Sequence, residues 1–426
     1  MAAMKSARRK PQSKRKYFKS RGFSRLFCFS WEQRKLGDIA EFSKGSGYSK
    51  GDLIESGTPI ILYGRLYTKY ETSISEVDTY VEAKDGSVYS KGGEVIVPAS
   101  GETAEDIARA ATVDKSGVIL GGDLNVVSPN EDINSAFLAI SISHGNSQRE
   151  LAKKAQGKSV VHIHNEEIKN LAVPFPAKAE QNKIVEYFSN FDNLITLHQR
   201  KCDETKKLKK YMLQKMFPQN GSKVPEIRFK GFTDEWEQCK FGEITELKSA
   251  SRVHKDEWTS NGVPFYRSSD VMAAINGTEN EKAFISEELY EKLSKVSGKL
   301  EEGDILVTGG GSVGNPYIVP DNKPLYTKDA DLLWIKNKGK FHPYFLYEFF
   351  FSPTFRNYLE SISHVGTIAH YTITQLSDTP ICLPSFDEQK EVGEYFQSLD
   401  NLITLHQHKC EELKKLKKFM LQNMFI

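Results

Sequence analysis

The chain has 426 residues, of which 39% are hydrophobic and 27% charged, so it is long enough for two or three domains and apolar enough to bury a core. No stretch approaches the roughly 18 apolar residues of a membrane-spanning helix, and the first residues lack the apolar core of a secretory signal, so we expect neither. The five cysteines form no C-x-x-C pair, which argues against a disulfide scaffold or a zinc module and favours a reducing cytoplasm.

The basic residues are concentrated at the N-terminus. Residues 1–30 hold ten Lys and Arg and no Asp or Glu, which leaves 48 basic and 56 acidic side chains, a net charge of −8, in the rest of the chain. Three origins of the basic segment stay open: a disordered arm, an extension from cloning or a displaced start site, and a frame-altered version of the usual beginning. Nucleic-acid binding by the rest of the chain would need a local basic patch.

The first recognisable motif is WEQRKLGDIAEF at residues 31–42. Strand-like runs rich in β-branched residues follow at 59–63, 94–97 and 117–120, and a cluster of Gly and Ser after residue 42 indicates a turn. We therefore predict a mixed α/β domain over residues 31–175.

A long helix is predicted next, within residues 176–218. Residues 180–217 read EQNKIVEYFSNFDNLITLHQRKCDETKKLKKYMLQKMF, and their mostly apolar side chains recur at steps of three and four residues, which is the pattern of a heptad seam. Such a helix has about 38 residues and is ~57 Å long at ~1.5 Å per residue. Pro218 and Gly221 are expected to end it.

After a linker at 219–235, the second half repeats the first. WEQCKFGEITEL at 236–247 matches the opening motif at an offset of 205, and residues 388–425 match the helix at an offset of 208 with 26 of 38 positions identical. The segment between has strand-like runs at 304–307 and 331–335. The repeat predicts a second mixed α/β domain at 236–383 and a second long helix within 384–426.

Both helices carry the same apolar stripe, and each must bury it against something. We expect the two to pair within the chain as an antiparallel coiled coil about a pseudo-twofold axis, so the fold is predicted to be α+β, with two mixed α/β domains separated by two long α-helices. The predicted seam includes Phe188, Phe191, Ile195, Cys202, Phe396, Leu399, Ile403 and Cys410.

Two histidines and four leucines also lie on or beside this stripe. His198 and His406 are expected to be partly buried structural residues, because no thiol or carboxylate cluster accompanies them at metal-ligand spacing. The leucines widen the stripe beyond a two-helix seam and leave apolar surface for another protein; they are Leu194, Leu197, Leu402 and Leu405.

No catalytic cluster repeats in the two halves. The run from Gly309 to Gly314 lacks the G-K-[ST] ending of a nucleotide-hydrolysing loop, so a tight turn and an approach of its N–H groups to a DNA backbone stay open. A duplicated reaction would need a Ser-His-Asp, paired-carboxylate or metal cluster in both halves. Its absence favours recognition over chemistry, with no catalytic residue and no metal site.

These motifs resemble a known family. The two W-x-x-x-K-x-G-[DE]-I motifs, the P-x-x-x-E-Q runs that begin at Pro176 and Pro384, and the L-I-T-L-H-Q…K-K-L-K-K helices are similar to those of the specificity subunit of type I restriction-modification systems. The resemblance covers Trp31 to Ile426. Residues 1–30 depart from it, because PEIRFKGF at 225–232 has no convincing counterpart there.

The resemblance implies that each α/β domain is a target recognition domain that reads one half of a bipartite DNA sequence, and that the paired helices are a spacer. It implies a non-catalytic subunit that recruits two adenine-methylating subunits and, in the full complex, two restriction subunits. This chain would itself bind no cofactor. S-adenosylmethionine, ATP and Mg would be held by the partner subunits, in the cytoplasm.

Basic and polar residues next to the predicted strand ends are the candidates for DNA contact. In the first domain they are Arg65, Lys69, Ser100, Arg109, Lys158 and His162. In the second domain they are Arg267, Ser268, Ser269, Ser312, Lys328 and His370. His162 and His370 match at the offset of 208, which a shared contact and a shared structural role explain equally well.

A function of another class stays open. The net charge of −8 outside residues 1–30 also suits a non-catalytic protein-interaction scaffold with a coiled-coil core, whose variable segments bind protein ligands. A stand-alone methylase or nuclease is disfavoured by the missing motifs. Sequence-selective DNA binding that weakens with salt separates the first hypothesis from the scaffold.

Overall fold

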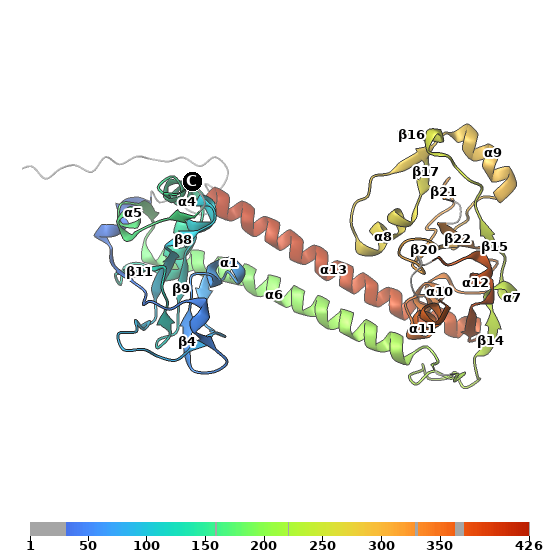
Figure 1. Ribbon diagram of the computed structural model, residues 1–426, viewed down its shortest axis with the longest axis horizontal. Helices are drawn as coiled ribbons and strands as arrows, with labels where there is room; N and C mark the ends of the chain where they lie inside the picture. The colour runs from blue at the N-terminus through green and yellow to red at the C-terminus, as the bar shows by residue number, and fades with distance from the viewer. Residues whose placement is uncertain (1–30, 158–159, 220, 329–330, 363–369, 426) are drawn as a thin grey trace, which may run out of the picture. The chain divides into compact units, whose positions relative to one another are not determined.

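The structure is a computed structural model that describes residues 31–157, 160–219, 221–328, 331–362 and 370–425, so the basic segment at 1–30 lies outside the described residues. The chain divides into two compact units (Figure 1). Unit 1 comprises residues up to Leu197 together with Lys409–Ile426, and unit 2 comprises His198–His408. Within the described residues, every helix is too short or too polar to span a bilayer.

Unit 1 contains a five-stranded sheet in the order β2-β11-β7-β9-β5, a four-stranded sheet in the order β10-β4-β6-β3, and the two-stranded pairs β1-β13 and β12-β8. Its strands are β1 (Glu32–Lys35), β2 (Ala40–Lys44), β3 (Leu53–Ile54), β4 (Thr58–Ile61), β5 (Ser73–Ile74), β6 (Tyr80–Val81), β7 (Glu94–Pro98), β8 (Ser100–Gly101), β9 (Ala111–Val113), β10 (Ile119–Leu120), β11 (Leu124–Pro129), β12 (Val161–His162) and β13 (Ala172–Phe175). Its shorter helices are η1 (Leu36–Asp38), η2 (Lys50–Asp52), α1 (Arg65–Thr68), α2 (Ala104–Ile107), α3 (Ser135–Ser143), α4 (Gly145–Ala152) and α5 (Asn165–Lys169).

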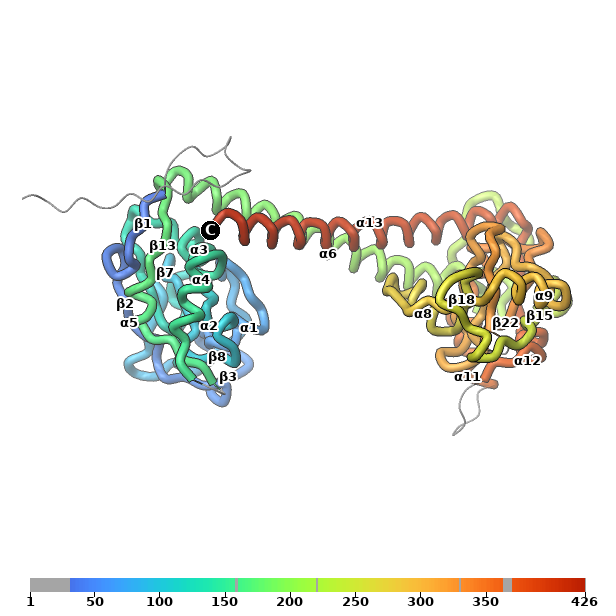
Figure 2. The backbone as a smooth tube through the Cα atoms, turned by 90° about the horizontal axis from the view of Figure 1, so that it is seen from above, coloured from blue at the N-terminus to red at the C-terminus, as the bar shows by residue number. Residues whose placement is uncertain are grey.

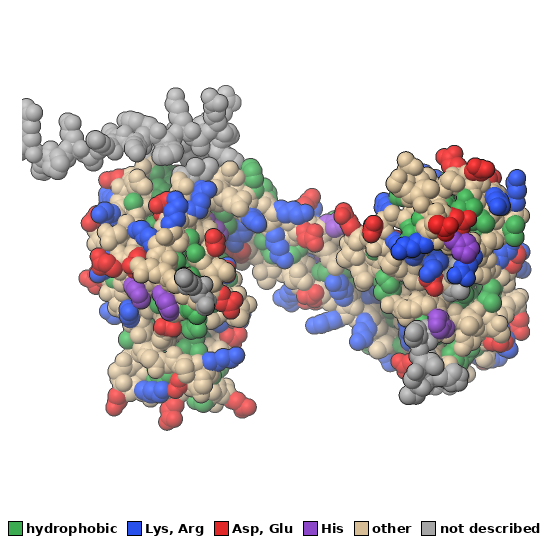
Figure 3. Space-filling model, turned by 45° about the horizontal axis from the view of Figure 1, so that its top comes forward, with side chains coloured by type: hydrophobic (Ala, Val, Ile, Leu, Met, Phe, Trp, Pro, Cys, Tyr) green, Lys and Arg blue, Asp and Glu red, His purple; other side chains and the backbone are tan. Residues whose placement is uncertain are grey.

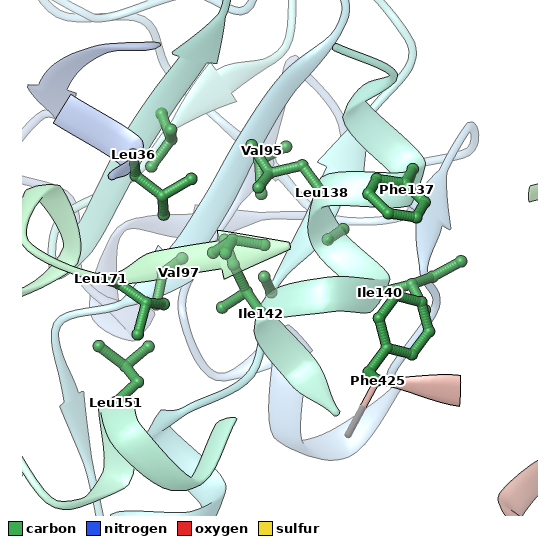
Figure 4. Close-up of a cluster of buried hydrophobic side chains, with 14 of the residues drawn as sticks. Leu36, Val95, Val97, Phe137, Leu138, Ile140, Ile142, Leu151, Leu171 and Phe425 are labelled. Atoms are coloured by element: carbon green, nitrogen blue, oxygen red, sulfur yellow. The ribbon is translucent and has the colours of Figure 1, made fainter. Parts of the chain in front are cut away.

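The main core of unit 1 lies between its central sheet and helix α3. Phe137 and Leu138 of α3 pack with Val95 and Val97 of β7 (Figure 4), and all four are 0% exposed. Phe425 at the end of the chain joins them, with its ring 5.8 Å from that of Phe137. Since each fully buried aliphatic or aromatic side chain contributes roughly 1.5–3 kcal/mol, this cluster ties the C-terminal end of the chain to the first α/β segment.

Unit 2 contains four-stranded sheets in the orders β15-β22-β19-β20 and β16-β18-β17-β21, and the pair β14-β23. Its strands are β14 (Glu237–Lys240), β15 (Leu247–Ser249), β16 (Trp258–Thr259), β17 (Val263–Tyr266), β18 (Ala283–Ile285), β19 (Ile305–Thr308), β20 (Pro316–Ile318), β21 (Tyr326–Thr327), β22 (Leu332–Ile335) and β23 (Pro380–Leu383). Its shorter helices are α7 (Phe241–Ile244), η3 (Lys255–Glu257), α8 (Ser268–Asn276), α9 (Glu287–Ser297), α10 (Pro343–Phe349), α11 (Pro353–Ile362) and α12 (Ile373–Asp378).

The two units share a topology although their variable segments differ in sequence. Strand β11 lies antiparallel between β2 and β7, as β22 lies between β15 and β19. Strand β4 is parallel to β10, as β17 is to β21. The glycine-rich run after β19 turns the chain into β20, and Gly311 and Gly314 have φ of 72° and 75°, a backbone that favours glycine. The run is therefore a hairpin turn.

Helices α6 (Lys178–Lys215) and α13 (Phe386–Met424) lie side by side in both views (Figures 1 and 2). Asp192 accepts a 2.5 Å hydrogen bond from Lys417 within unit 1, and Lys209 donates one of 2.7 Å to Asp400 within unit 2. Residue numbers rise along one helix as they fall along the other, so the predicted antiparallel pairing is confirmed. These two ion pairs are themselves related by the offset of 208.

The predicted seam residues lie on the inner sides of this pair. Phe188 and Phe191 also join the core of unit 1, and Phe396 and Leu399 that of unit 2. Cys202 and Cys410 are buried, whereas Ile195 and Ile403 are half-buried. The predicted histidines meet within unit 2, where Nδ1 of His198 lies 3.0 Å from Nδ1 of His406.

The repeated P-x-x-x-E-Q motif fixes the start of each long helix. Gln181 donates a 3.0 Å bond to the Pro176 carbonyl and accepts one of 2.8 Å from the Asn134 backbone. Gln389 makes the same two bonds in unit 2, to the Pro384 carbonyl and from the His342 backbone, each at 3.0 Å. Because both glutamines are buried, these bonds satisfy amide groups that would otherwise be costly to desolvate.

Candidate nucleic-acid interface

Three polar side chains meet at the edge of the central sheet of unit 1. Ser100 on β8 lies with its Oγ 3.3 Å from Oδ2 of Asp123 and 3.1 Å from Nδ1 of His162. Pairing of β8 with β12 sets His162 opposite Ser100. Asp123 has a φ of 57°, uncommon for a residue other than glycine. Three separate segments of the chain therefore converge at one point.

The backbone of unit 2 makes an equivalent arrangement. In unit 1 the amide of Ala99 donates to Asp123 at 2.7 Å and the Ala99 carbonyl accepts from Ile163 at 3.0 Å. In unit 2 Gly309 takes the place of Ala99, because its amide donates to Asp331 and its carbonyl accepts from Tyr371, each at 2.8 Å. Asp331 and His370 thus correspond to Asp123 and His162.

Gly310 takes the place of Ser100 in unit 2, where it forms a β-bridge with His370. A Cβ built on Gly310 would lie 3.3 Å from Oδ1 of Asp331 and 3.9 Å from Nδ1 of His370. The aspartate and the histidine therefore flank the same point in both units. The serine that lies between them in unit 1 is absent from unit 2, where Lys328 pairs with Asp331 instead.

The other predicted contacts of unit 1 lie elsewhere. Arg65 is only 9% exposed, and its guanidinium donates to Asp78, to Glu71 and to a backbone carbonyl, so few of its donors remain for DNA. Lys69 is exposed and also pairs with Asp78. Arg109 donates to the carbonyl of Leu66 and lies over the Tyr70 ring. Lys158 lies outside the described residues.

In unit 2, two predicted residues join the Asp331 group. Lys328 pairs with its carboxylate, and Ser268 donates a 3.0 Å bond to its carbonyl. Arg267 pairs with Asp270 at 3.0 Å. The exposed Ser269 accepts a 3.0 Å bond from Asn280.

Ser312 is exposed in the turn between β19 and β20, where its carbonyl caps the turn by accepting from Asn315 at 2.7 Å. Histidine side chains reach the surface of both units (Figure 3). His162 and His370 are both exposed.

Sequence reasoning missed Asp123, Asp331 and Gly310 as members of these sites. The repeated Asp-Leu pairs at 123–124 and 331–332 share the offset of 208 with the two histidines. This common offset could have indicated that the aspartates and the histidines belong to the same site. The pairing of β8 with β12, which joins the segments, is a long-range feature that the local pattern does not encode.

Burial changes the titration of two groups in unit 1. Burial and the cations Lys417 and Arg109 lower the pKa of His144 to about 4, so this histidine is neutral at neutral pH and does not attract phosphate. Burial raises the pKa of Tyr67, whose hydroxyl donates a 2.8 Å bond to the Ser100 carbonyl. Within the parts of the chain that the structure describes, no three potential ligands gather into a metal site.

Comparison with known proteins decides the family. The model of the type I restriction modification DNA specificity domain matches residues 30–207 and 233–415. The chain belongs to this family. The resemblance found in the sequence is thereby confirmed, and the chain is the DNA specificity subunit of a type I restriction-modification system, the component of such a complex that is not itself catalytic.

Two curated specificity subunits and two solved structures are similar over most of the chain. The type I restriction enzyme MjaVIII specificity subunit of Methanocaldococcus jannaschii is 23% identical, over 91% of this chain and 90% of its own length. The putative MjaX specificity subunit of the same organism is 26% identical over 91% of each chain. The crystal structure of a type I S subunit from M. genitalium has a TM-score of 0.56 at 15% identity, covering 94% of this chain and 98% of that one. That from Thermoanaerobacter tengcongensis has a TM-score of 0.50 at 16% identity, with the same coverage.

Proposed function

We propose that this specificity subunit reads a bipartite, non-palindromic DNA target, one half-site with each variable segment. The observation that carries the proposal is the shared topology of the two units, in which corresponding strands pair in the same way under different surface residues, although the central sheet of unit 1 has one more strand, β5. A duplicated reader with diverged surfaces suits two half-sites that need not match. Base-edge contacts of about 1–3 kcal/mol each would supply discrimination.

The candidate contacts divide by their surroundings. Ser100, His162, Lys328 and His370 border the matched sites, whereas Ser269 is exposed on α8 and Ser312 in the turn between β19 and β20. We propose His162 and His370, which match in the two units, for contacts common to both half-sites, and Lys328, Ser269 and Ser312 for contacts special to one. Ser100 lies against His162. Arg65 is the weakest candidate, because its guanidinium is already bonded to carboxylates.

Partner subunits would bind an apolar stripe on the long helices. In an antiparallel pair the g positions of both helices flank the same side of the seam, and the c positions lie next to them. The g and c positions of unit 1 carry Leu194, Leu197, Leu416 and Phe419, and those of unit 2 carry Leu208, Tyr211, Leu402 and Leu405. All eight are between 44% and 57% exposed, which is typical of surface that another protein covers.

Because the stripe occurs once in each unit, we propose that the subunit binds two methylation subunits, one on each stripe. S-adenosylmethionine, and ATP with Mg where restriction subunits join, would be bound by those partners rather than by this chain. The assembly would act on DNA in the cytoplasm, as type I systems methylate and cleave DNA.

The test exchanges residues 43–175 for those of a relative and maps the methylated motif in cells that supply the methylation subunit. One half-site should change while the other half-site and the gap stay the same. A change of both half-sites, or of neither, contradicts the proposal. If the variable segments instead bind proteins, as in a scaffold, the purified complex will show no preference among DNA sequences at any salt concentration.

A further inference from the structure

The aspartate–histidine pair that the two units share calls for a role common to both half-sites. Side chains that read bases must differ between units that read different sequences. The sugar–phosphate backbone is the same at every half-site, and contacts to it position a protein without selecting sequence. A polar arrangement kept in both units therefore fits the backbone better than it fits the bases.

We propose that His162 and His370 each donate a hydrogen bond to a phosphate of the DNA backbone, at equivalent places in the two half-sites. Asp123 and Asp331 lie behind the two rings, and Ser100 is a positioning residue for His162. The inference rests on the proposed function, because it names the part of the DNA that these candidate residues contact.

The ring of His162 is held so that its outer nitrogen is available. Its Nδ1 lies 3.1 Å from the Ser100 hydroxyl, and its backbone exchanges two hydrogen bonds with Gln156, of 2.8 and 3.1 Å. Among the described residues no partner is found for Nε2, and the side chain is exposed. The inner half of the ring is therefore anchored and the outer half faces solvent.

Two protonation states make Nε2 a donor. In the neutral ring with hydrogen on Nε2, Ser100 donates to Nδ1. In the cation, Nδ1–H donates to Ser100, which is then free to donate to Asp123 at 3.3 Å. Phosphate oxygens only accept hydrogen bonds, so both states match them. The cationic state adds charge attraction to the phosphate.

Each carboxylate lies close to a hydrogen-bond donor. Asp123 accepts from Ser100 when His162 is a cation, and its backbone carbonyl accepts from Ala99 in either state. Asp331 is paired with the ammonium of Lys328, which offsets its charge toward an approaching phosphate. In unit 2 position 310 is glycine, so His370 lacks a counterpart of Ser100 at that position, and we infer that it is less firmly oriented than His162.

A structural role for the histidines is the competing explanation, since β12 pairs with β8 through His162. The two explanations differ in what a ring replacement does. A structural role predicts a lower unfolding temperature and an indirect loss of binding. A phosphate contact predicts weaker binding to every sequence by one factor at an unchanged unfolding temperature.

The experiment measures duplex affinity of the complex of this chain with its methylation subunits. One duplex carries the motif found by methylation mapping, and the other is a shuffled duplex of the same length. His162→Ala and His370→Ala should each weaken binding to both duplexes about tenfold, as expected for a hydrogen bond to a charged group. The double variant should weaken it about a hundredfold, because separate sites add. The mapped motif should stay the same.

Matched variants separate the role of the ring from that of its neighbours. His162→Gln keeps a donor and should recover part of the loss. Ser100→Gly should weaken binding less than His162→Ala does, and the combination should be no weaker than His162→Ala alone. Gly310→Ser should tighten binding once the Asp331 carboxylate shifts by a few tenths of an ångström, because the glycine φ is not left-handed and a Cβ there lies 3.3 Å from Oδ1 of Asp331 and 3.9 Å from Nδ1 of His370. His408→Ala, an exposed histidine on α13, should change nothing.

Three outcomes would overturn the inference while leaving the proposed function intact. They are unchanged affinity in both alanine variants, a loss confined to the motif duplex, and a mapped motif altered at a base. A fall in unfolding temperature in both His162 variants with normal affinity of the folded fraction would assign the ring a structural role instead. If the wild-type complex itself shows no preference for the motif duplex, the proposed function fails and this inference fails with it.

Discussion

Glu348 breaks the symmetry between the two ion pairs of the long helices. Lys209 donates to Asp400 and also to Glu348, at 2.7 and 2.8 Å, and Glu348 is only 1% exposed. Its second oxygen has no partner among the described residues. At the offset of 208 the counterpart of Glu348 in unit 1 is Ile140. The Lys417–Asp192 pair therefore has no third carboxyl at that position.

This buried carboxyl predicts a pH-dependent stability of unit 2. Burial raises the pKa of Glu348 to about 8, and the nearby Asp400 adds to the rise against the opposing effect of Lys209. The folded state then binds a proton that the unfolded chain, with a glutamate pKa of about 4.3, releases. The stability that this bound proton contributes is fully present below the unfolded pKa. It falls as the pH rises from there to about 8, and above that pH it does not change further.

Calorimetric unfolding of the protein between pH 5 and 9 measures this slope. Glu348→Gln should flatten it and should raise the unfolding temperature of unit 2 at pH 9, because a neutral amide replaces a buried charge. Asp192→Asn removes a carboxylate from the other ion pair and should leave the slope unchanged. A slope that survives in Glu348→Gln would place its origin in another group.

Among the elements, the long helices were predictable and the site geometry was not. The heptad pattern is local, so residues 180–217 and 388–425 alone predict α6 and α13 nearly to their ends. The pairing of the two helices could also be predicted from the sequence, because the repeat gives both helices the same apolar stripe. The parallel pairing of β17 with β21 joins Phe265 to Tyr326, and no local pattern carries such a distant contact.

Charge alone does not predict how a candidate residue is bonded in the fold. Arg65 is basic and lies beside a strand end, which favoured DNA contact, but carboxylates at 71 and 78 bind its guanidinium. Those partners are distant enough in sequence that only the fold brings them together. Asp123 was visible as part of a repeat, yet its neighbours Ser100 and His162 come from two other segments.

The apolar stripe of unit 1 predicts loss of one partner subunit when it is made acidic. Replacing Leu416 and Phe419 with Glu places charge on side chains 47% and 57% exposed, so the fold should tolerate both changes. The complex should bind one methylation subunit instead of two, as measured by light scattering after chromatography. The control replaces Ser189 and Thr196, which are exposed b positions of α6 away from the stripe, with Glu. This variant should still bind two methylation subunits. Two bound in the stripe variant would refute the stripe as the docking surface.

For the whole molecule, duplication explains why each unit contains parts of both long helices. Unit 1 takes the first half of α6 and the last turns of α13, and unit 2 takes the remainder of each. An antiparallel pair allows this exchange, because the closing helix of one half returns to the α/β segment of the other. Under the proposed function, these two helices would set the distance between the half-sites.

A matched lengthening of both helices tests the spacer. NLITLHQ occurs at 193–199 and again at 401–407, and His198 faces His406 within these heptads. Duplicating this heptad in both helices places the two insertions opposite each other. A whole heptad in each helix also keeps the seam residues in register. Each helix grows by ~10.5 Å at ~1.5 Å per residue, which is about three base pairs at ~3.4 Å each. The half-sites should stay the same while the gap between them widens by about three base pairs, as read by methylation mapping.

Duplication in α6 alone provides the control. This one-sided insertion moves Lys209 about two helical turns away from Asp400 and separates seam residues that touch in the wild-type protein. The complex should therefore lose its methylation activity. An unchanged gap in the matched variant, with methylation retained, would mean that the distance between half-sites is set outside the helix pair. In that event the two readers would have to be positioned by the methylation subunits rather than by this chain.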